Sequence, residues 1–370
     1  MSQKRFFPNL NGVRFIAAFM VLIHHVEQAK HAVGLQNIYD LTIVQHMGRL
    51  GVGLFFVLSG FLITYLLLQE KANHGNIAAG SFYLRRAFRI WPIYFIVILS
   101  SYFIFPHLSL FEYPGAVENV TNHYHERLGF LLLILPNFAF ILYDLPYWCA
   151  QAWSIGVEEQ FYYLWPWLLK YPKRSWLIII FFLVVTALIL WLGLYFLQDP
   201  LAIKQQKVMA FIGQFRLQVM AFGGLLAWLV FKENNTILAT LFRKDVQYGV
   251  YAFTLAFFLS GLHFSGFMEI YALLFGFFIL NVSCNPKSVI NLEFKWISYL
   301  GKISYGLYLY HVIAIVFTIN ILKPIQPESP AIYNLLLYTI AIAVTILVCA
   351  LSFEFLEKPL LRYKDKKFGR

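Results

Sequence analysis

The chain alternates between long apolar blocks and short polar stretches, and this alternation predicts most of its secondary structure. There are eleven apolar blocks. One of them, Leu128 to Tyr143, is interrupted by Pro136 and Asn137, so we expect it to be a re-entrant or interfacial segment. The pattern therefore predicts an all-α polytopic membrane protein with about ten transmembrane helices. The blocks close to the membrane-spanning length of about 20 residues are 10–29, 50–69, 90–106, 155–170, 176–197, 208–231, 247–263, 267–284, 297–321 and 332–357.

The basic residues give this arrangement a direction. With both termini in the cytoplasm, 22 of the 29 Lys and Arg fall in cytoplasmic stretches and 7 fall on the other side. This asymmetry follows the positive-inside rule. It also requires an odd number of crossings between residues 107–127, which lie outside, and Lys170 to Arg174, which lie inside, so one block between them does not span. Pro136 and Asn137 favour Leu128 to Tyr143 as that block. We expect one membrane-embedded domain over 1–370, with a short cytoplasmic tail at about 358–370 and no second soluble domain.

Composition agrees with a membrane protein. Hydrophobic residues make up 60% of the chain and charged residues 13%, whereas soluble domains carry about 25% charged residues. The net charge of +11 does not indicate nucleic-acid binding, because the basic residues are spread over loops beside the bilayer, where membrane lipids are the natural partners. Three widely spaced cysteines, Cys149, Cys284 and Cys349, predict neither a disulfide framework nor a metal site.

Ionisable side chains inside spanning segments are expensive, so each is a candidate functional residue. Arg14 and His25 are eleven residues apart in the first helix. This spacing places them within roughly 20° of one helix face and about 16 Å apart along the axis. His24 should face elsewhere. The alternative is that Arg14 snorkels to lipid headgroups and His25 is an interfacial histidine.

A second candidate group lies in AWSIGVEEQFYYLWP, at the outer end of a predicted helix. Ser154 and Glu158 are an i, i+4 pair and share a helix face. One interpretation is that Ser154 is an N-cap and Glu158 a stabilising first-turn acid. The other is that Glu158 orients or deprotonates a histidine.

His311 in GKISYGLYLYHV follows Ser304 and Tyr308 on one helical stripe. It is the second histidine that the topology places toward the outside, which favours a site over a structural role. The string FYLRRAFRIWP carries Arg85, Arg86 and Arg89 on the cytoplasmic side. These arginines could bind a phosphate or merely anchor the topology. The small residues of GVGLFFVLSGFLIT permit close helix contact.

Taken together, these strings resemble the membrane-bound acyltransferase 3 family, the integral-membrane O-acyltransferases of bacterial surface glycans. The resemblance covers almost the whole chain and departs from many members at Asn11, where Asp is common, and at Phe15, where a small residue is common. It depends on LNGVRFIAAFMVLIHH, FFVLSGFL, RRAFRIWP, WSIGVEEQFYYLWP, ISYGLYLYH and FEFLEKPL.

The resemblance implies a location in the bacterial inner membrane and transfer of an acyl group, usually acetyl, from cytoplasmic acyl-CoA to an extracytoplasmic saccharide or glycolipid, such as lipopolysaccharide O-antigen or exopolysaccharide. By this analogy His25 is the essential histidine, Arg14 and the Arg85/Arg86/Arg89 group bind coenzyme A, and Glu158 with Ser154 supports the transfer site.

Two mechanisms are open: His25 is a general base on the acceptor hydroxyl, or it carries the acyl group transiently. Neither requires a metal, and no metal-ligand spacing is present. One rival interpretation is a proton-coupled transporter or flippase, in which His25, Glu158 and His311 form a proton relay. It predicts internal pseudo-symmetry, which the hydropathy lacks. Another is a silent scaffold that binds glycan or acyl-CoA without turnover.

Overall fold

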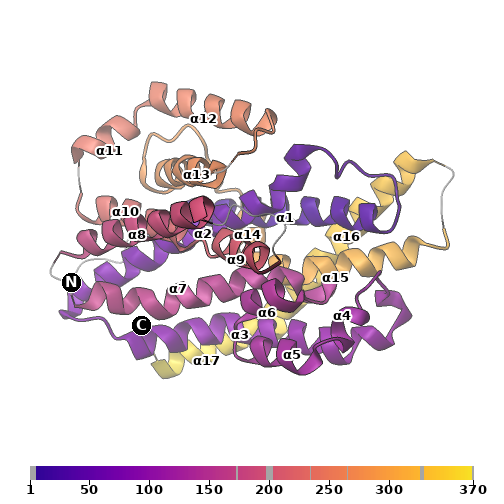
Figure 1. Ribbon diagram of the computed structural model, residues 1–370. Coiled ribbons are helices and arrows are strands. Elements are labelled where there is room, and N and C mark those ends of the chain that lie inside the picture. The colour runs from indigo at the N-terminus through magenta and orange to yellow at the C-terminus, as the bar shows by residue number, and fades with distance from the viewer. Residues whose placement is uncertain are drawn as a thin grey trace. The chain divides into compact units, whose positions relative to one another are not determined.

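A computed structural model describes residues 6–171, 174–196, 203–233, 235–264, 266–325 and 329–368. Within these residues every regular element is helical and no strand occurs (Figure 1). The helices are α1 (Leu10–Ala32), α2 (Thr42–His74), α3 (Ala79–Phe103), α4 (Glu118–Thr121), α5 (Tyr124–Leu132), α6 (Pro136–Tyr143), α7 (Trp153–Lys170), α8 (Ser175–Phe196), α9 (Ile203–Gln214), α10 (Leu217–Phe231), α11 (Asn235–Leu241), α12 (Lys244–Leu259), α13 (Phe267–Cys284), α14 (Lys295–Lys302), α15 (Ser304–Leu322), α16 (Pro330–Ser352) and α17 (Lys358–Phe368). Short 3₁₀ segments lie at Phe105–His107, Ser109–Phe111 and Tyr147–Ala152, and a π-helical turn at Phe353–Glu357.

The all-α polytopic fold is confirmed. In the described part of the chain, eight helical stretches are long and apolar enough to cross a bilayer. Two further predicted spans fall on α7, which contains three charged residues and Pro166, and on α12, whose 16 residues cover about 24 Å. Four residues that the predicted topology places inside lie outside the described residues: Lys4, Arg5, Lys173 and Arg370.

Two predicted spans are interrupted. The block 208–231 is divided between α9 and α10, and the block 297–321 between α14 and α15. At the second break, Gly301 packs against the backbone of Asn11 so closely that a Cβ would overlap the Asn11 carbonyl. Hydropathy does not detect such a break, because the residues on both sides of it are apolar.

The segment Leu128 to Tyr143 does not form one spanning helix. It is divided into α5 and α6, of nine and eight residues, with Ile134 at a φ of 60° between them. Pro136 and Asn137 are buried, and both contact the backbone at Gly156. Burial in protein is the condition under which broken backbone is tolerated at membrane depth.

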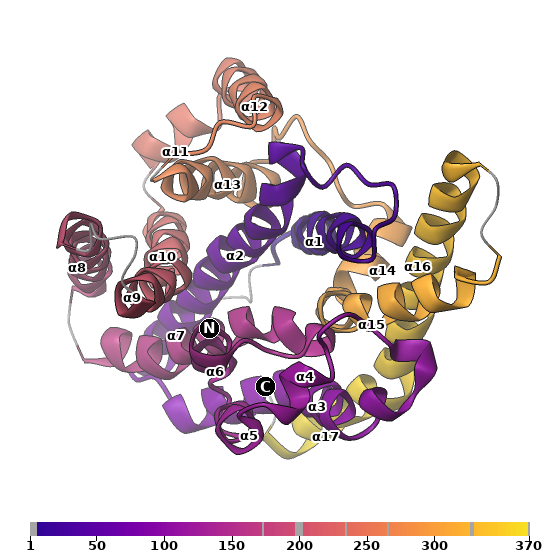
Figure 2. The same cartoon turned by 45° about the vertical axis from the view of Figure 1, so that its right-hand side comes forward.

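The helices form two compact units, which we describe separately. Unit 1 consists of residues 1–17, 49–79 and 157–301. In it α10 packs against α8 and α13 (Figure 2). The α2 and α10 backbones also approach closely: a Cβ at Gly60 would overlap the Met220 carbonyl, and one at Gly223 would overlap that of Val57. The close helix contact expected from the small residues of the second block is therefore present at Gly60.

Unit 2 consists of residues 18–48, 80–156 and 302–370. Its largest contact is between α15 and α16, which run antiparallel to each other (Figure 1). The second half of α1 packs parallel to α15, and both helices contact α16. The buried side chains of this core are Leu22, Val26, Ala29, Ile315, Ile319, Leu322, Tyr333, Leu337 and Ala341.

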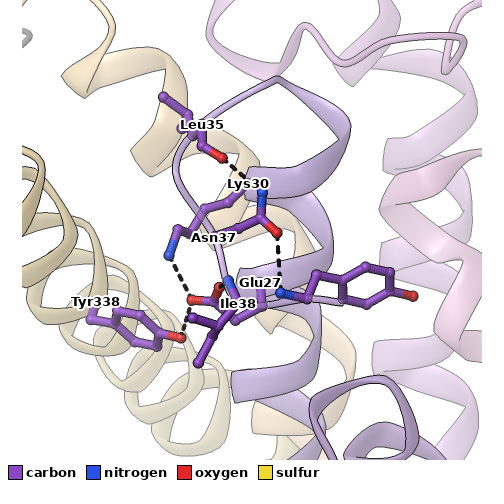
Figure 3. Close-up of polar contacts among 7 residues, drawn as sticks. Glu27, Lys30, Leu35, Asn37, Ile38 and Tyr338 are labelled. Carbon is purple, nitrogen blue, oxygen red and sulfur yellow. Dashed lines mark hydrogen bonds and ion pairs between the residues drawn. The ribbon is translucent and has the colours of Figure 1, made fainter. Parts of the chain in front are cut away.

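A buried ion pair ties the end of α1 to α16 and to the loop after α1 (Figure 3). The Glu27 carboxylate accepts hydrogen bonds from Lys30 Nζ at 2.6 Å and the Ile38 backbone N–H at 2.7 Å. A third comes from the Tyr338 hydroxyl at 2.5 Å. Glu27 and Lys30 are 1% and 2% exposed. Such a pair is tolerated in an apolar core because both charges have partners.

The cysteines are free thiols. Cys149 and Cys349 are buried, and burial raises the pKa of the Cys149 thiol to about 12. Cys149 is therefore protonated at neutral pH, and a protonated thiol is a poor nucleophile.

Gly60→Ala should destabilise unit 1 by about 1–3 kcal/mol, because the added methyl group must displace the α10 backbone. Gly249→Ala is the matched control, since a Cβ there has no atom within 4 Å. Thermal unfolding in detergent measures both. Equal melting temperatures for the two variants would contradict the close contact.

Lys30→Met should lower the free energy of unfolding by about 3–5 kcal/mol, because it leaves the buried Glu27 carboxylate without its cation. As a control, Asp245→Asn removes an ion pair with Arg243 in which both side chains are 63% exposed, and it should have little effect. If Lys30→Met unfolds like the control variant, the ion pair does not stabilise the core.

Candidate functional site

Two histidines from different helices meet inside unit 2. His25 on α1 and His311 on α15 approach to 3.0 Å between His25 Nδ1 and His311 Nε2, and their ring centroids are 4.8 Å apart. His311 is fully buried and His25 half-buried. The sequence singled out both residues, and the structure brings them into direct contact. His24 points to a different partner, the Val44 carbonyl, yet its ring lies edge-on to that of His25.

Backbone carbonyls determine which ring nitrogens carry the protons. His25 Nδ1 lies 2.9 Å from the Val21 carbonyl oxygen, and His311 Nδ1 lies 3.1 Å from that of Leu307. A carbonyl oxygen can only accept, so each Nδ1 carries a hydrogen. In the neutral rings His311 Nε2 is then an acceptor, and the single hydrogen on His25 Nδ1 is shared between it and the Val21 carbonyl oxygen. The remaining nitrogen, His25 Nε2, has a free lone pair and no hydrogen-bond partner among the described residues.

Ser154 belongs to a hydrogen-bonded chain next to His311. The hydroxyl groups of Ser154 and Tyr308 share a hydrogen bond at 2.6 Å, and the Gln151 carbonyl accepts from Tyr308 at 2.8 Å and from Ser154 at 3.4 Å. The Tyr308 ring centroid lies 6.1 Å from that of His311. The N-cap interpretation of Ser154 is wrong, because α7 already includes Trp153 and continues directly from the 3₁₀ segment Tyr147–Ala152.

Gln151 is a polar residue of this cluster that sequence reasoning missed. It is 2% exposed, and its amide nitrogen donates to the carbonyls of Leu309 at 2.7 Å and Trp148 at 3.1 Å. These two bonds orient the amide, and its oxygen has no hydrogen-bond partner in the described part of the chain. A buried acceptor without a partner is rare and is available to a bound hydroxyl or N–H. The signal that could have identified it is the amide side chain of Gln151 itself, a polar group in the apolar stretch directly before AWS.

Glu158 lies in unit 1, on the part of α7 beyond residue 156. Its carboxylate accepts hydrogen bonds from Ser59 Oγ at 2.9 Å and from Tyr162 Oη at 3.3 Å. Ser59 comes from the FFVLSGFL string, so two strings of the sequence analysis meet here. The hydroxyl groups hold the carboxylate in one orientation, as an acid or base requires.

The arginines fall into both units. Arg14 on α1 belongs to unit 1 and donates to Asn11 Oδ1 at 2.9 Å. Arg85, Arg86 and Arg89 lie on the first turns of α3 in unit 2, where Arg89 is exposed and Arg85 and Arg86 are half-buried. Because α3 is continuous here, Arg85 and Arg89 share one face, an arrangement that suits a phosphate.

Residues 7–354 match the profile of an acyltransferase domain, that of the acyltransferase 3 family. The chain is 25% identical to the peptidoglycan O-acetyltransferase OatA of Listeria monocytogenes, covering 99% of this chain and 59% of that protein. It is 27% identical to the O-acetyltransferase OatA of Staphylococcus aureus, covering 100% of this chain and 59% of that protein. The chain thus spans about three fifths of the length of these relatives. No solved structure matches it.

Ser154→Ala and Tyr308→Phe should each lower the free energy of unfolding by about 1 kcal/mol. The double variant should lose less than the sum of the two, because both substitutions remove the same hydrogen bond between Ser154 and Tyr308. Chemical denaturation of the four proteins gives the coupling. Tyr299→Phe, at an exposed tyrosine, should combine additively with Ser154→Ala. If the effects of Ser154→Ala and Tyr308→Phe are also additive, the hydrogen bond between Ser154 and Tyr308 does not contribute to stability.

Proposed function

Because the chain belongs to the acyltransferase 3 family, we propose that it moves an acyl group, in the simplest case acetyl, from cytoplasmic acyl-CoA to a hydroxyl of an extracytoplasmic saccharide. Two relatives bear the name O-acetyltransferase, and the name of the Listeria protein specifies peptidoglycan. Peptidoglycan therefore joins lipopolysaccharide O-antigen and exopolysaccharide as an acceptor. We also propose that the protein lies in the bacterial inner membrane, with both termini in the cytoplasm.

One observation carries the chemistry: His25 Nε2 has a free lone pair while the other side of its ring is held by Val21 and His311. In the proposed reaction Nε2 takes the proton of the acceptor hydroxyl as the hydroxyl oxygen bonds to the thioester carbonyl carbon. The carbon–sulfur bond then breaks, and the departing thiolate takes the proton back from His25. His311 Nε2 accepts from His25 Nδ1–H and so stabilises the transient imidazolium.

A two-step version uses the same nitrogen. His25 Nε2 attacks the thioester first, the thiolate leaves, and the acyl group resides on the imidazole until the acceptor hydroxyl displaces it. The hydroxyl proton passes to the freed Nε2 and from there to the thiolate. In this version a labelled acyl group stays on the protein when the acceptor is omitted. The direct version leaves the protein unlabelled.

The remaining residues hold the substrates and the reacting groups. Arg85 and Arg89, on one face of α3, with Arg86 beside them, are proposed to bind the phosphates of coenzyme A. Arg14 keeps the coenzyme A-binding role that the family resemblance implies. Glu158, oriented by Ser59 and Tyr162, is proposed to support acyl transfer, and Ser154 to keep Tyr308 in place.

His25→Ala should reduce acetyl transfer by about 10²–10⁴-fold, the usual contribution of a positioned acid or base. His311→Gln should lower kcat more than it changes KM for acyl-CoA, because it acts on the transient charge of His25. His107→Gln, at an exposed histidine outside the pair, is the control. The measurement is transfer of labelled acetyl from acetyl-CoA by protein purified into nanodiscs, with surface-glycan O-acetylation in a complemented deletion strain as the cellular readout.

The outcomes separate the alternatives. Full activity of a folded His25→Ala protein would overturn the proposed chemistry. Wild-type protein that neither hydrolyses nor transfers from acetyl-CoA, combined with an unchanged glycan in the deletion strain, would favour the transporter or scaffold interpretation.

A further inference from the structure

A cavity with both apolar and polar lining lies in unit 2, beyond the histidine pair along the same two helices. Its volume is about 670 Å³, within the range of about 300–1,000 Å³ typical of small-ligand sites. It begins at Ala32, roughly 10 Å past His25 along α1. On α15 it includes Val316, Ile319 and Asn320, which likewise lie beyond His311. On the predicted topology this is the extracytoplasmic end of both helices.

The cavity is lined by groups that recognise hydroxyls. Exposed charged side chains from two segments face it: Glu112 and Glu118 before α5, and Lys323 after α15. None of the three has an ion-pair or side-chain hydrogen-bond partner among the described residues. Asn320 uses its amide nitrogen to bind the carbonyls of Leu110, Glu112 and Val316, which leaves its amide oxygen as an acceptor. Carboxylates and amide oxygens accept from hydroxyl groups, and an ammonium donates to them.

Two glycines shape the wall of the cavity. Gly34, just after α1, has a φ of +73°, and Gly115, in the loop before α4, has a φ of +69°. Both values lie in the left-handed region that favours glycine. The turns at these positions place the loop after α1 and the loop before α4 on the same cavity, although they are far apart in sequence.

Aromatic rings connect the cavity to the histidine. Tyr113 lines the cavity and stacks on Tyr147, with ring centroids 3.8 Å apart and planes 7° from parallel. The Tyr147 hydroxyl donates to the His25 backbone carbonyl at 3.4 Å. Burial raises the pKa of Tyr113 to about 12 and that of Tyr147 well above its usual value, so both phenols are protonated at physiological pH. Each can therefore donate a hydrogen bond.

We propose that this cavity is the saccharide subsite of the acceptor. Its aromatic wall suits the C–H face of a sugar ring, and its carboxylates, amide oxygen and ammonium suit the hydroxyls at the edge of the ring. The position beyond His25 and His311 directs a bound chain toward the histidine pair. This inference rests on the proposed acyl transfer, which requires a saccharide acceptor near the histidine pair.

The test uses the full chain in nanodiscs with tetra-N-acetylchitotetraose as the probe, since it is an uncharged chain of β-linked hexosamine rings with free hydroxyls. Calorimetry measures binding, and labelled acetyl-CoA measures transfer. Tyr113→Leu, Glu118→Ala and Lys323→Ala should each weaken probe binding and raise the acceptor KM by about tenfold. Tyr113→Phe keeps the ring and removes the hydroxyl, so it should weaken probe binding less than Tyr113→Leu. Glu126→Ala, an exposed acid on α5 outside the cavity, is the matched control.

Glu118 and Lys323 are exposed, so their variants should fold even if Tyr113→Leu does not. If the wild type binds and transfers while all cavity variants behave like Glu126→Ala, the subsite is wrong although the proposed function holds. If the wild type binds through these residues but transfers nothing, the proposed function fails and the saccharide site remains. If the wild type neither binds nor transfers, both fail.

Discussion

The arrangement of polar groups in this protein depends on one constraint: a buried polar side chain on an apolar helix must find its partner within the protein. The commonest solution is the carbonyl four residues earlier on the same helix, which accepts from Ser101, Thr318 and Thr345. The two histidines use the same solution, through Val21 and Leu307. In a hydroxyl this bond only satisfies a donor. In an imidazole it also selects the tautomer, because a carbonyl cannot donate.

This selection prepares the chemistry. A histidine in apolar surroundings could hold its proton on either nitrogen, and a base with the wrong tautomer does not work. Here the backbone of α1 holds the proton of His25 on Nδ1, His311 accepts from the same atom, and Nε2 remains for the reaction. No acidic residue is needed for this orientation in unit 2. Glu27, the nearest acid in sequence, is already bound by Lys30, Tyr338 and the Ile38 N–H, so its charge is used to hold the loop.

Close packing provides the rigidity that such positioning requires. Gly60 and Gly223 bring the α2 and α10 backbones into contact in unit 1, and Gly306 packs against Cys349 between α15 and α16 in unit 2. In a bilayer the hydrophobic effect does not favour one helix pair over another, so close backbone approach and interhelical hydrogen bonds supply much of the specificity. The bond from Tyr305 Oη to the Ile90 carbonyl, at 2.7 Å, is one that joins α15 to α3.

Local properties of the sequence were enough to predict the all-α fold, most of the spanning helices, the broken segment at Pro136, and His25, His311, Ser154 and Glu158 as candidates, because hydropathy, proline and the cost of buried charge act within one helix. Tertiary structure decided the rest. The contact between His25 and His311, the chain from Ser154 through Tyr308 to Gln151, and the anchoring of Glu27 each join helices far apart in sequence. Their geometry follows from how apolar faces pack, and apolar residues of similar size carry no signal that names their partner.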